Sequence, residues 1–110
     1  MVDILANNAK AQIAACKLLA AMSNAKRLQV LALLSDREMV VGALAEKVEL
    51  SQSALSQHLS KLKAAGLVST RREAQMIYYS CVSAPVHSVL ATLRSIYTDT
   101  ATSRTAAKTA

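Results

Sequence analysis

The chain has 110 residues, 53% of them hydrophobic but none Trp or Phe, and a formal net charge of +6. This length allows one domain or one subunit of a small oligomer, and a monomer of this size buries only about two-thirds of its unfolded surface. No apolar run approaches the roughly 18 residues that span a bilayer and the N-terminus does not read as a signal peptide, so we expect a cytoplasmic protein without membrane contact, whose cysteines are reduced thiols.

Residues 4–22 are predicted to form the first helix. Apolar residues and alanines cover most of its circumference, and only Lys10 and Lys17 carry charge. Such a helix is normally buried, and a small monomer has little interior in which to bury it. We therefore expect this helix to lie in a subunit interface.

A second helix is predicted near 25–35, with Asn24 as its candidate N-cap. Lys26 and Arg27 lie in its first turn, where positive charge opposes the helix macrodipole at a cost of roughly a few tenths of a kcal/mol. A contact outside the helix, for instance with a DNA phosphate, would offset that cost. The alternative is a solvated basic pair.

The third and fourth helices, near 42–48 and at 52–65, are joined by a very short connection. A polar turn at 36–38 and a short strand at 39–41 precede them. Two short helices in this arrangement, the second of them amphipathic, are typical of a helix-turn-helix.

Clear start and stop signals bound the fourth helix. Ser51 is a candidate N-cap, and Gly66 suits the left-handed position that follows many helices. Between them Leu55, Leu59 and Leu62 recur at helical spacing and form one apolar stripe.

Small polar residues occupy the opposite face of this helix. Ser53, Gln57 and Ser60 point away from the leucines, with Ser56 to one side, and no acidic residue occurs in 51–72. Such a face can approach a polyanion closely and still form hydrogen bonds. The alternative is an ordinary solvated helix face.

Two β-rich runs, 67–72 and 76–81, predict a hairpin whose turn lacks the usual Gly or Asn. Arg71 and Arg72 are expected at its tip, with Gln75 just across.

A last helix begins near Pro85, and an apolar stripe continues along it to residue 97. Residues 100–110 show no apolar periodicity, so we expect a disordered basic tail there and a folded domain over residues 1–99.

This order of elements predicts a mainly α winged helix-turn-helix with about five helices and a two-stranded β-hairpin wing. Residues 51–110 contain seven basic and two acidic groups and therefore hold +5 of the +6, which favours nucleic acid as the partner. No carboxylate partner or oxyanion feature accompanies His58 and the helix serines, so an enzyme is not expected. The alternative of another class is a protein-interaction module with the same fold.

The same residues resemble a known family. The stretches SNAKRLQVLALL from Ser23 and VGALAEKVELSQSALSQHLSKLKAAGLVSTRREAQMIYYS from Val41 are similar to the ArsR/SmtB family of dimeric bacterial repressors, over roughly residues 15–98. Within the family the chain is most similar to the rhizobial nodulation repressors, which lack the metal sites of other members. The resemblance implies a homodimer paired through the first and last helices, a recognition helix at 52–65 and a wing at 67–81.

Neither metal site of the family is matched. Val40 and Gly42 stand where metal-sensing relatives have a Cys-x-Cys, and in the last helix only His87 remains, with Pro85 in place of the Asp. One His does not make a zinc site, which usually needs about four ligands. We therefore expect no metal and no other cofactor.

The two cysteines leave an alternative open. Cys16 lies in an apolar helix and is most simply a small buried hydrophobic residue, and Cys81 has no basic neighbour in sequence that would activate its thiol. A thiol-responsive repressor that is switched through a Cys16–Cys81 disulfide is the alternative.

We expect a repressor that binds double-stranded DNA as a homodimer. Its operator should be pseudo-palindromic and lean toward A·T, because Gln pairs well with adenine and no Arg or Asn stands on the polar helix face. The expected base-reading residues are Gln52, Ser53, Ser56 and Gln57. The residues expected on the DNA backbone or in wing contacts are Lys26, Arg27, Ser51, Ser60, Lys61, Lys63, Arg71, Arg72 and Gln75. Those expected in the dimer interface are Ile4, Leu5, Ile13, Leu18, Val89, Leu93, Ile96 and Tyr97.

Overall fold

The structure is a computed structural model that describes the backbone of residues 2–107 and the side chains of residues 2–98. The N-terminal segment consists of two helices, α1 (Ile4–Asn7) and α2 (Ala9–Met22). The prediction of one helix over 4–22 is therefore wrong at Asn8, which has an extended backbone with φ −130°. Its side chain accepts a hydrogen bond from the N–H of Ala11 and so caps α2, which is a role that asparagine favours over a position inside a helix.

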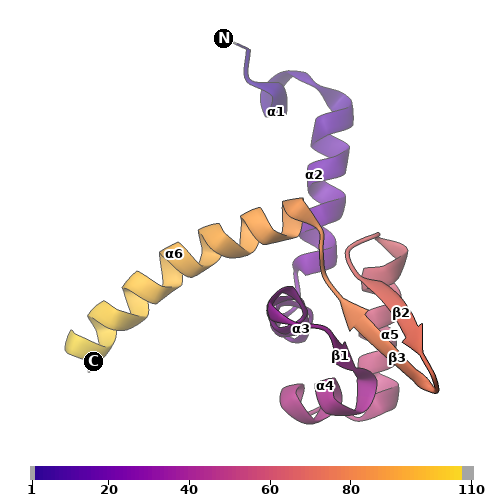
Figure 1. The fold of residues 1–110 in the computed structure, drawn as a ribbon. Helices are drawn as coiled ribbons and strands as arrows, with labels where there is room; N and C mark the ends of the chain where they lie inside the picture. Colours follow the sequence, from indigo (N-terminus) through magenta and orange to yellow (C-terminus); the bar gives the residue numbers. More distant parts are fainter. Residues whose placement is uncertain (1, 108–110) are drawn as a thin grey trace.

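The remaining elements follow in the predicted order. They are α3 (Ala25–Asp36), β1 (Met39–Val40), α4 (Val41–Val48), α5 (Gln52–Ala64), β2 (Ser69–Glu73), β3 (Met76–Ser80) and α6 (Ala84–Ala107). The mainly α winged helix-turn-helix is confirmed, with six helices in the described residues because the first predicted helix is divided. Figure 1 shows α4 and α5 beside the wing formed by β2 and β3.

The three strands form one antiparallel sheet in the order β1-β3-β2. Tyr79 of β3 pairs with Met39 on one side and with Thr70 on the other. Beyond the sheet, the N–H of Cys81 donates to the carbonyl of Leu34 at the end of α3. The wing is therefore joined by backbone hydrogen bonds to the helical part of the domain at its base.

One hydrophobic core lies between the helices and the base of the sheet. Aliphatic side chains from α3, α4, α5 and α6 fill it, and among the side chains that the structure describes none that is buried is polar or charged. Its largest fully buried members are Leu31, Leu34, Leu44, Leu55, Leu59, Leu62, Val30, Val48 and Val86.

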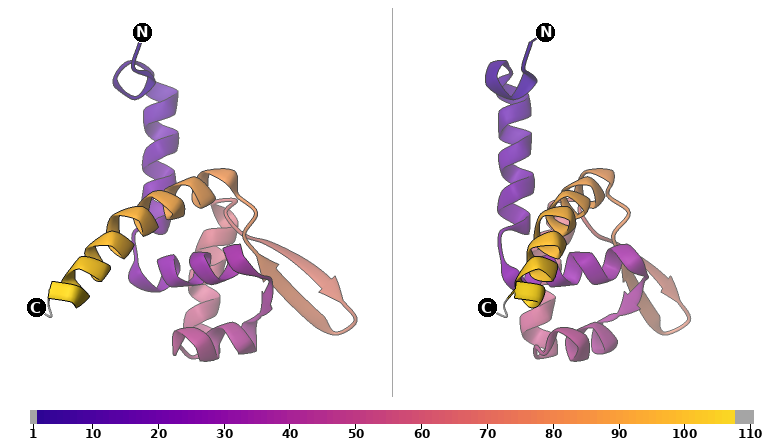
Figure 2. Two further views of the ribbon diagram at one scale, coloured as in Figure 1. Left: turned by 60° about the vertical axis from the view of Figure 1, so that its left-hand side comes forward. Right: turned by 90° about the vertical axis from the view of Figure 1, so that its left-hand side faces the viewer.

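Helices α2 and α6 extend from this core in different directions, and the left-hand view in Figure 2 shows their far ends apart from the rest of the domain. Helix α6 continues to Ala107, whereas the sequence predicts a disordered tail over 100–110. Residues 108–110 lie outside the described residues, and the domain boundary at residue 99 stays a prediction. Among the described helices, none has the length and apolarity needed to span a bilayer.

Candidate nucleic-acid interface

Helix α5 is oriented by its leucines. Leu55, Leu59 and Leu62 are each at most 1% exposed and lie in the core. Ser51 is the N-cap, because its hydroxyl oxygen accepts a hydrogen bond from the N–H of Ala54 at 3.1 Å. The predicted start of this helix and its predicted buried face are both confirmed, and Gly66 has the expected left-handed backbone with φ +76°.

The predicted base-reading residues share the outer face of α5. Gln52, Ser53, Ser56 and Gln57 are exposed, and so is Ser60 one turn further along. Hydroxyl and amide groups can form hydrogen bonds with base edges or with phosphate oxygens. The helix also carries no carboxylate that would repel a polyanion.

Positive charge lies near the C-terminal end of α5. Lys61 and Lys63 are exposed in its last turn, where cations also favour the helix macrodipole. The ammonium of Lys63 lies 3.4 Å from the hydroxyl of Thr70 on β2. Lys63 therefore lies between the C-terminal end of α5 and the start of the wing.

The wing turns at Ala74 and Gln75, between the paired residues Glu73 and Met76. Ala74 takes the left-handed conformation, with φ 55°, which for a residue with a Cβ costs roughly 1–2 kcal/mol. The prediction that both arginines lie at the tip is wrong. Glu73 and Met76 form the last pair before the turn, Arg72 lies in the pair before that, and Arg71 lies one pair further from the turn. Gln75 is at the tip, and Arg72 is exposed beside it.

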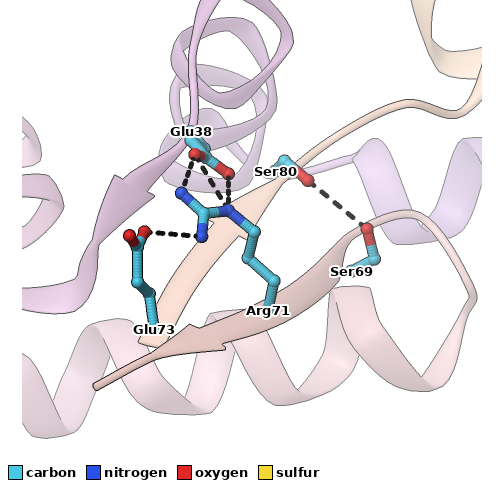
Figure 3. Close-up of polar contacts among 5 residues, drawn as sticks. All are labelled: Glu38, Ser69, Arg71, Glu73 and Ser80. Carbon is cyan, nitrogen blue, oxygen red and sulfur yellow. Dashed lines mark hydrogen bonds and ion pairs between the residues drawn. The ribbon is translucent and has the colours of Figure 1, made fainter. Parts of the chain in front are cut away.

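Arg71 lies further back and points toward the rest of the domain (Figure 3). Its guanidinium donates to both carboxylate oxygens of Glu38, at 2.9 and 3.0 Å from Nε, and to Glu73 at 2.8 Å. It also lies 4.5 Å from the centroid of the Tyr78 ring. The hydrogen bond from Arg71 holds the pKa of Glu38 below its ordinary value. Arg71 is thus engaged by two carboxylates, so this geometry does not support its expected DNA contact.

Lys26 and Arg27 also point into the protein. The ammonium of Lys26 donates to the carbonyl of Val48 at the end of α4, and Arg27 donates from Nε to the carbonyl of Ala21 at 2.6 Å. Cations at helix C-termini stabilise the helix, which explains why the start of α3 tolerates two of them. The expectation that these residues contact phosphate is not supported by this geometry.

His58 is half-buried on the flank of α5, and its Nδ1 lies 3.4 Å from the guanidinium of Arg27. Burial lowers its pKa, and the charges of Arg27 and Lys61 lower it further. A neutral imidazole whose Nδ1 accepts from Arg27 fits this arrangement.

The positions of the family metal sites carry no cluster of ligands. No group of three or more His, Cys, Asp or Glu side chains comes together among the described residues. Gly42 lies beside the start of α5, where an added Cβ would be 3.6 Å from the side-chain amide of Gln52. The Nε2 of His87 donates to the carbonyl of Cys81 at 2.8 Å, so that nitrogen is occupied.

Both cysteines are free thiols in the structure. Cys16 is exposed on α2 and Cys81 is buried in the core, where it packs with aliphatic side chains. The expectation that Cys16 is a buried residue is therefore wrong for the single chain. The disulfide alternative stays a prediction.

The residues expected in a dimer interface lie on the two projecting helices and on α1. Six large apolar side chains there are 49–62% exposed: Ile4, Leu5, Ile13, Leu19, Ile96 and Tyr97. Leu18, Val89 and Leu93 are half-buried. Leu19 was not among the expected residues, although its apolar side chain and its helix were the signals that identified its neighbours.

Sequence reasoning missed the partners of the inward-pointing cations. In the sequence Glu38 is only part of a polar turn, and the carbonyls of Ala21 and Val48 carry no side-chain signal. The unfavourable placement of charge at the start of α3 was a signal that these cations bind something. It does not say whether the partner is inside or outside the protein.

Comparisons with known proteins agree with this geometry. The model of the family described as bacterial regulatory protein, arsR family, matches residues 24–70, which include α3, α4 and α5. The Nodulation protein NolR of Rhizobium meliloti is 63% identical over 81 residues, which are 74% of this chain and 66% of that protein. The transcriptional activator HlyU of Vibrio cholerae is 48% identical over 91 residues, 83% of this chain and 81% of that protein.

A solved structure is similar over nearly the whole fold. The crystal structure of NolR from Sinorhizobium fredii has 54% sequence identity and a TM-score of 0.78, and the match covers 88% of this chain and 97% of that one. The similarity therefore extends from the helix-turn-helix to the wing and to the projecting helices.

Proposed function

This chain belongs to the ArsR family of bacterial DNA-binding transcriptional regulators, and from that premise we propose that it is a homodimeric repressor that reads the major groove with α5. The observation that carries the proposal is the exposed face of Gln52, Ser53, Ser56 and Gln57 at the start of α5. The N-terminal part of a recognition helix is the part that contacts base edges in helix-turn-helix proteins. Gln can form two hydrogen bonds with one adenine, whereas Ser is less selective among bases. We therefore infer an operator that is rich in A·T pairs and whose sequence can vary.

We propose that backbone contacts come from a smaller set than the sequence suggests. Arg72 and Gln75 at the end of the wing, with Lys61 and Lys63 on α5, are exposed on the elements beside the reading face. Ser60 completes the polar face. The hydroxyl oxygen of Ser51 already accepts a hydrogen bond as the N-cap of α5, so Ser51 can contact a phosphate only by donating its hydroxyl hydrogen. Lys26, Arg27 and Arg71 are left out because each already binds groups of the protein.

Dimerisation through α2 and α6 is part of the proposal. The large apolar side chains exposed on these helices need a cover, since contiguous apolar patches on a soluble protein mark interaction sites. A dimer paired through these helices carries two copies of α5. Two-fold symmetry then gives a pseudo-palindromic site with half-sites about one helical turn, roughly 34–36 Å, apart.

We further propose that this regulator does not respond to metal. Val40 and Gly42 offer no side-chain ligand, and the Gly42 position is next to Gln52. A metal titration of the protein–DNA complex with Zn²⁺, Co²⁺ or Cu⁺ should leave its dissociation constant unchanged. A shift of tenfold with any of them would overturn this part.

The function itself is tested with genomic DNA. Fragments selected by the purified protein from its source genome would be bound again in a fluorescence anisotropy assay across a salt series. Gln57→Ala should change the base preferred at one position of each half-site, by about 1–3 kcal/mol. Arg72→Ala should weaken all sites alike and lower the salt slope by about 1. Arg37→Ala, at an exposed arginine that directly follows α3, is the matched control. The proposal fails if no fragment is enriched, or if affinity does not depend on salt.

A further inference from the structure

Arg27 joins three helices at the point where α2 leaves the domain. Its Nε donates to the carbonyl of Ala21 at 2.6 Å, and a terminal nitrogen lies 3.3 Å from the carbonyl of Ala20. Its other terminal nitrogen lies 3.4 Å from Nδ1 of His58 on α5. Arg27 itself belongs to α3, where its backbone N–H donates to the N-cap Asn24. One side chain therefore contacts both the last turn of α2 and α5, the second helix of the helix-turn-helix.

The end of α2 needs this contact. A helix leaves its last four carbonyls without partners inside the helix, and α2 ends at Met22. The carbonyl of Ala20 also accepts from the N–H of Ser23, and that of Met22 from the N–H of Asn24. The guanidinium supplies the donor for Ala21, and its charge complements the negative end of the helix macrodipole.

The neighbouring residue has a parallel role. Lys26 donates to the carbonyl of Val48, at the end of the first helix of the helix-turn-helix. Two consecutive residues of α3 thus hold the C-terminal ends of α2 and α4, while Arg27 alone reaches α5. Arg27 is therefore the polar link between the projecting helix and the reading helix.

The angle of α2 depends on this link because little else holds the helix. Only its C-terminal part, with Leu18, Ala21 and Met22, packs against the core, and Figure 2 shows the rest of α2 projecting from the domain. The helix has 14 residues and is about 21 Å long at 1.5 Å per residue. A tilt of about 10° at its base would move its far end by roughly 4 Å, which is close to the rise of one base pair.

We propose that Arg27 is a positioning residue that sets the angle between α2 and α5, and thereby the half-site spacing that the dimer reads. This inference rests on the proposed function, because it requires that the dimer forms through α2 and binds two half-sites. The planar guanidinium suits the role, since its fixed fork of donors can bind carbonyls and an imidazole in one geometry. A phosphate contact, which the sequence suggests for the same residue, would have a different signature.

The test uses the full-length protein and a selected palindromic site whose central spacer is lengthened or shortened by one and two base pairs. Wild-type affinity should peak at one spacing. Arg27→Gln should flatten the peak, so that the preference for the best spacing over its neighbours falls by a factor of about five or more, with the salt slope unchanged. Arg37→Gln, the same change at an exposed arginine that directly follows α3, should keep the wild-type profile.

The outcomes separate the alternatives. An unchanged spacing profile in Arg27→Gln overturns the proposal, and if the salt slope also falls by about 0.9, Arg27 is a phosphate contact. Arg27→Lys keeps the positive charge but loses the planar set of donors, so it should flatten the spacing profile partly. If circular dichroism shows that Arg27→Gln does not fold, the spacing profile of Arg27→Lys tests the proposal in its place. Failure of the wild-type protein to bind DNA or to prefer any spacing would instead refute the proposed dimeric function.

Discussion

Arg71 on β2 reaches across β3 and binds Glu38, which lies 33 residues earlier in the chain. The guanidinium of Arg71 lies over the ring of Tyr78, the residue paired with Arg71 in the sheet. Glu38 belongs to the turn between α3 and β1, so the ion pair connects the far strand of the wing to the helical part of the domain. The wing is therefore held in place by a side-chain contact as well as by its backbone pairing.

Replacing Glu38 by Gln should loosen the wing without unfolding the domain. The pair is exposed, and such pairs contribute little to global stability. Amide hydrogen exchange in β2 and β3 should become faster by a factor of up to about five, the upper range for an exposed pair. Glu73→Gln is the matched control, because Glu73 binds the same guanidinium from within β2 and connects no second element. Equal exchange in the two variants would show that Glu38 does not restrain the wing.

The same contact should be insensitive to pH near neutrality. Arg71 holds the pKa of Glu38 below its ordinary value of 4.5. A carboxyl whose folded-state pKa is lowered stabilises the fold above its unfolded pKa and loses this effect as the pH falls through the lowered value. The exchange difference between wild type and Glu38→Gln should therefore persist from pH 8 to about 5 and vanish only in more acidic solution.

Changing Ile13 to Asp should disrupt the dimer. Ile13 is 57% exposed on α2, and a buried unpaired carboxylate in its place would be strongly unfavourable. Sedimentation velocity should show a shift from dimer to monomer at micromolar concentration, and DNA affinity should fall by at least about 100-fold as the two half-sites are no longer linked. Ile77→Asp, at a 40% exposed position in the wing, is the control and should leave the dimer intact. A monomeric wild-type protein would contradict the proposed interface.

Ser51→Ala should destabilise the protein by about 1 kcal/mol, because it removes the acceptor for the N–H of Ala54. A urea titration measures this as a shift of the midpoint at constant slope. Ser51→Asp keeps a capping oxygen and should retain the stability, yet its negative charge at the start of α5 should weaken DNA binding. If Ser51→Asp binds DNA as tightly as wild type, Ser51 does not face the phosphate backbone.

The features that were predicted from the sequence depend on local signals. The cap at Ser51, the leucine stripe of α5 and the left-handed Gly66 each follow from residues within one or two helical turns. The division of the first helix at Asn8 was missed because apolar residues continue on both sides of the break, although the Asn7–Asn8 pair is itself a local signal.

The direction of the cations could not be predicted in the same way. Folding determines which groups Lys26, Arg27 and Arg71 bind, and three of these groups are backbone carbonyls that any residue could supply. A basic residue in sequence is equally compatible with a phosphate and with a helix end. Exposure was predictable for Arg72 and Gln75 because hairpin geometry alone places them near the turn.

The pH dependence of stability provides a last test, through His58. Burial is the main cause that lowers its pKa from 6.5, followed by the charges of Arg27 and Lys61. The folded protein therefore binds fewer protons at this site than the unfolded chain between the lowered pKa and 6.5, and stability rises with pH across that window. Below the lowered pKa the loss is complete and constant.

His58→Gln should remove this contribution, because glutamine does not titrate. The urea midpoints of wild type and His58→Gln are measured from pH 5 to 8. As the pH rises, the midpoint of wild type should increase relative to that of His58→Gln. Arg27→Gln keeps the burial of His58 but removes one of the two charges that oppose its protonation, so the rise should be smaller and begin closer to 6.5. Parallel profiles for wild type and His58→Gln would mean that the imidazole is protonated equally in the folded and unfolded states, and that its contact with Arg27 does not require the neutral form.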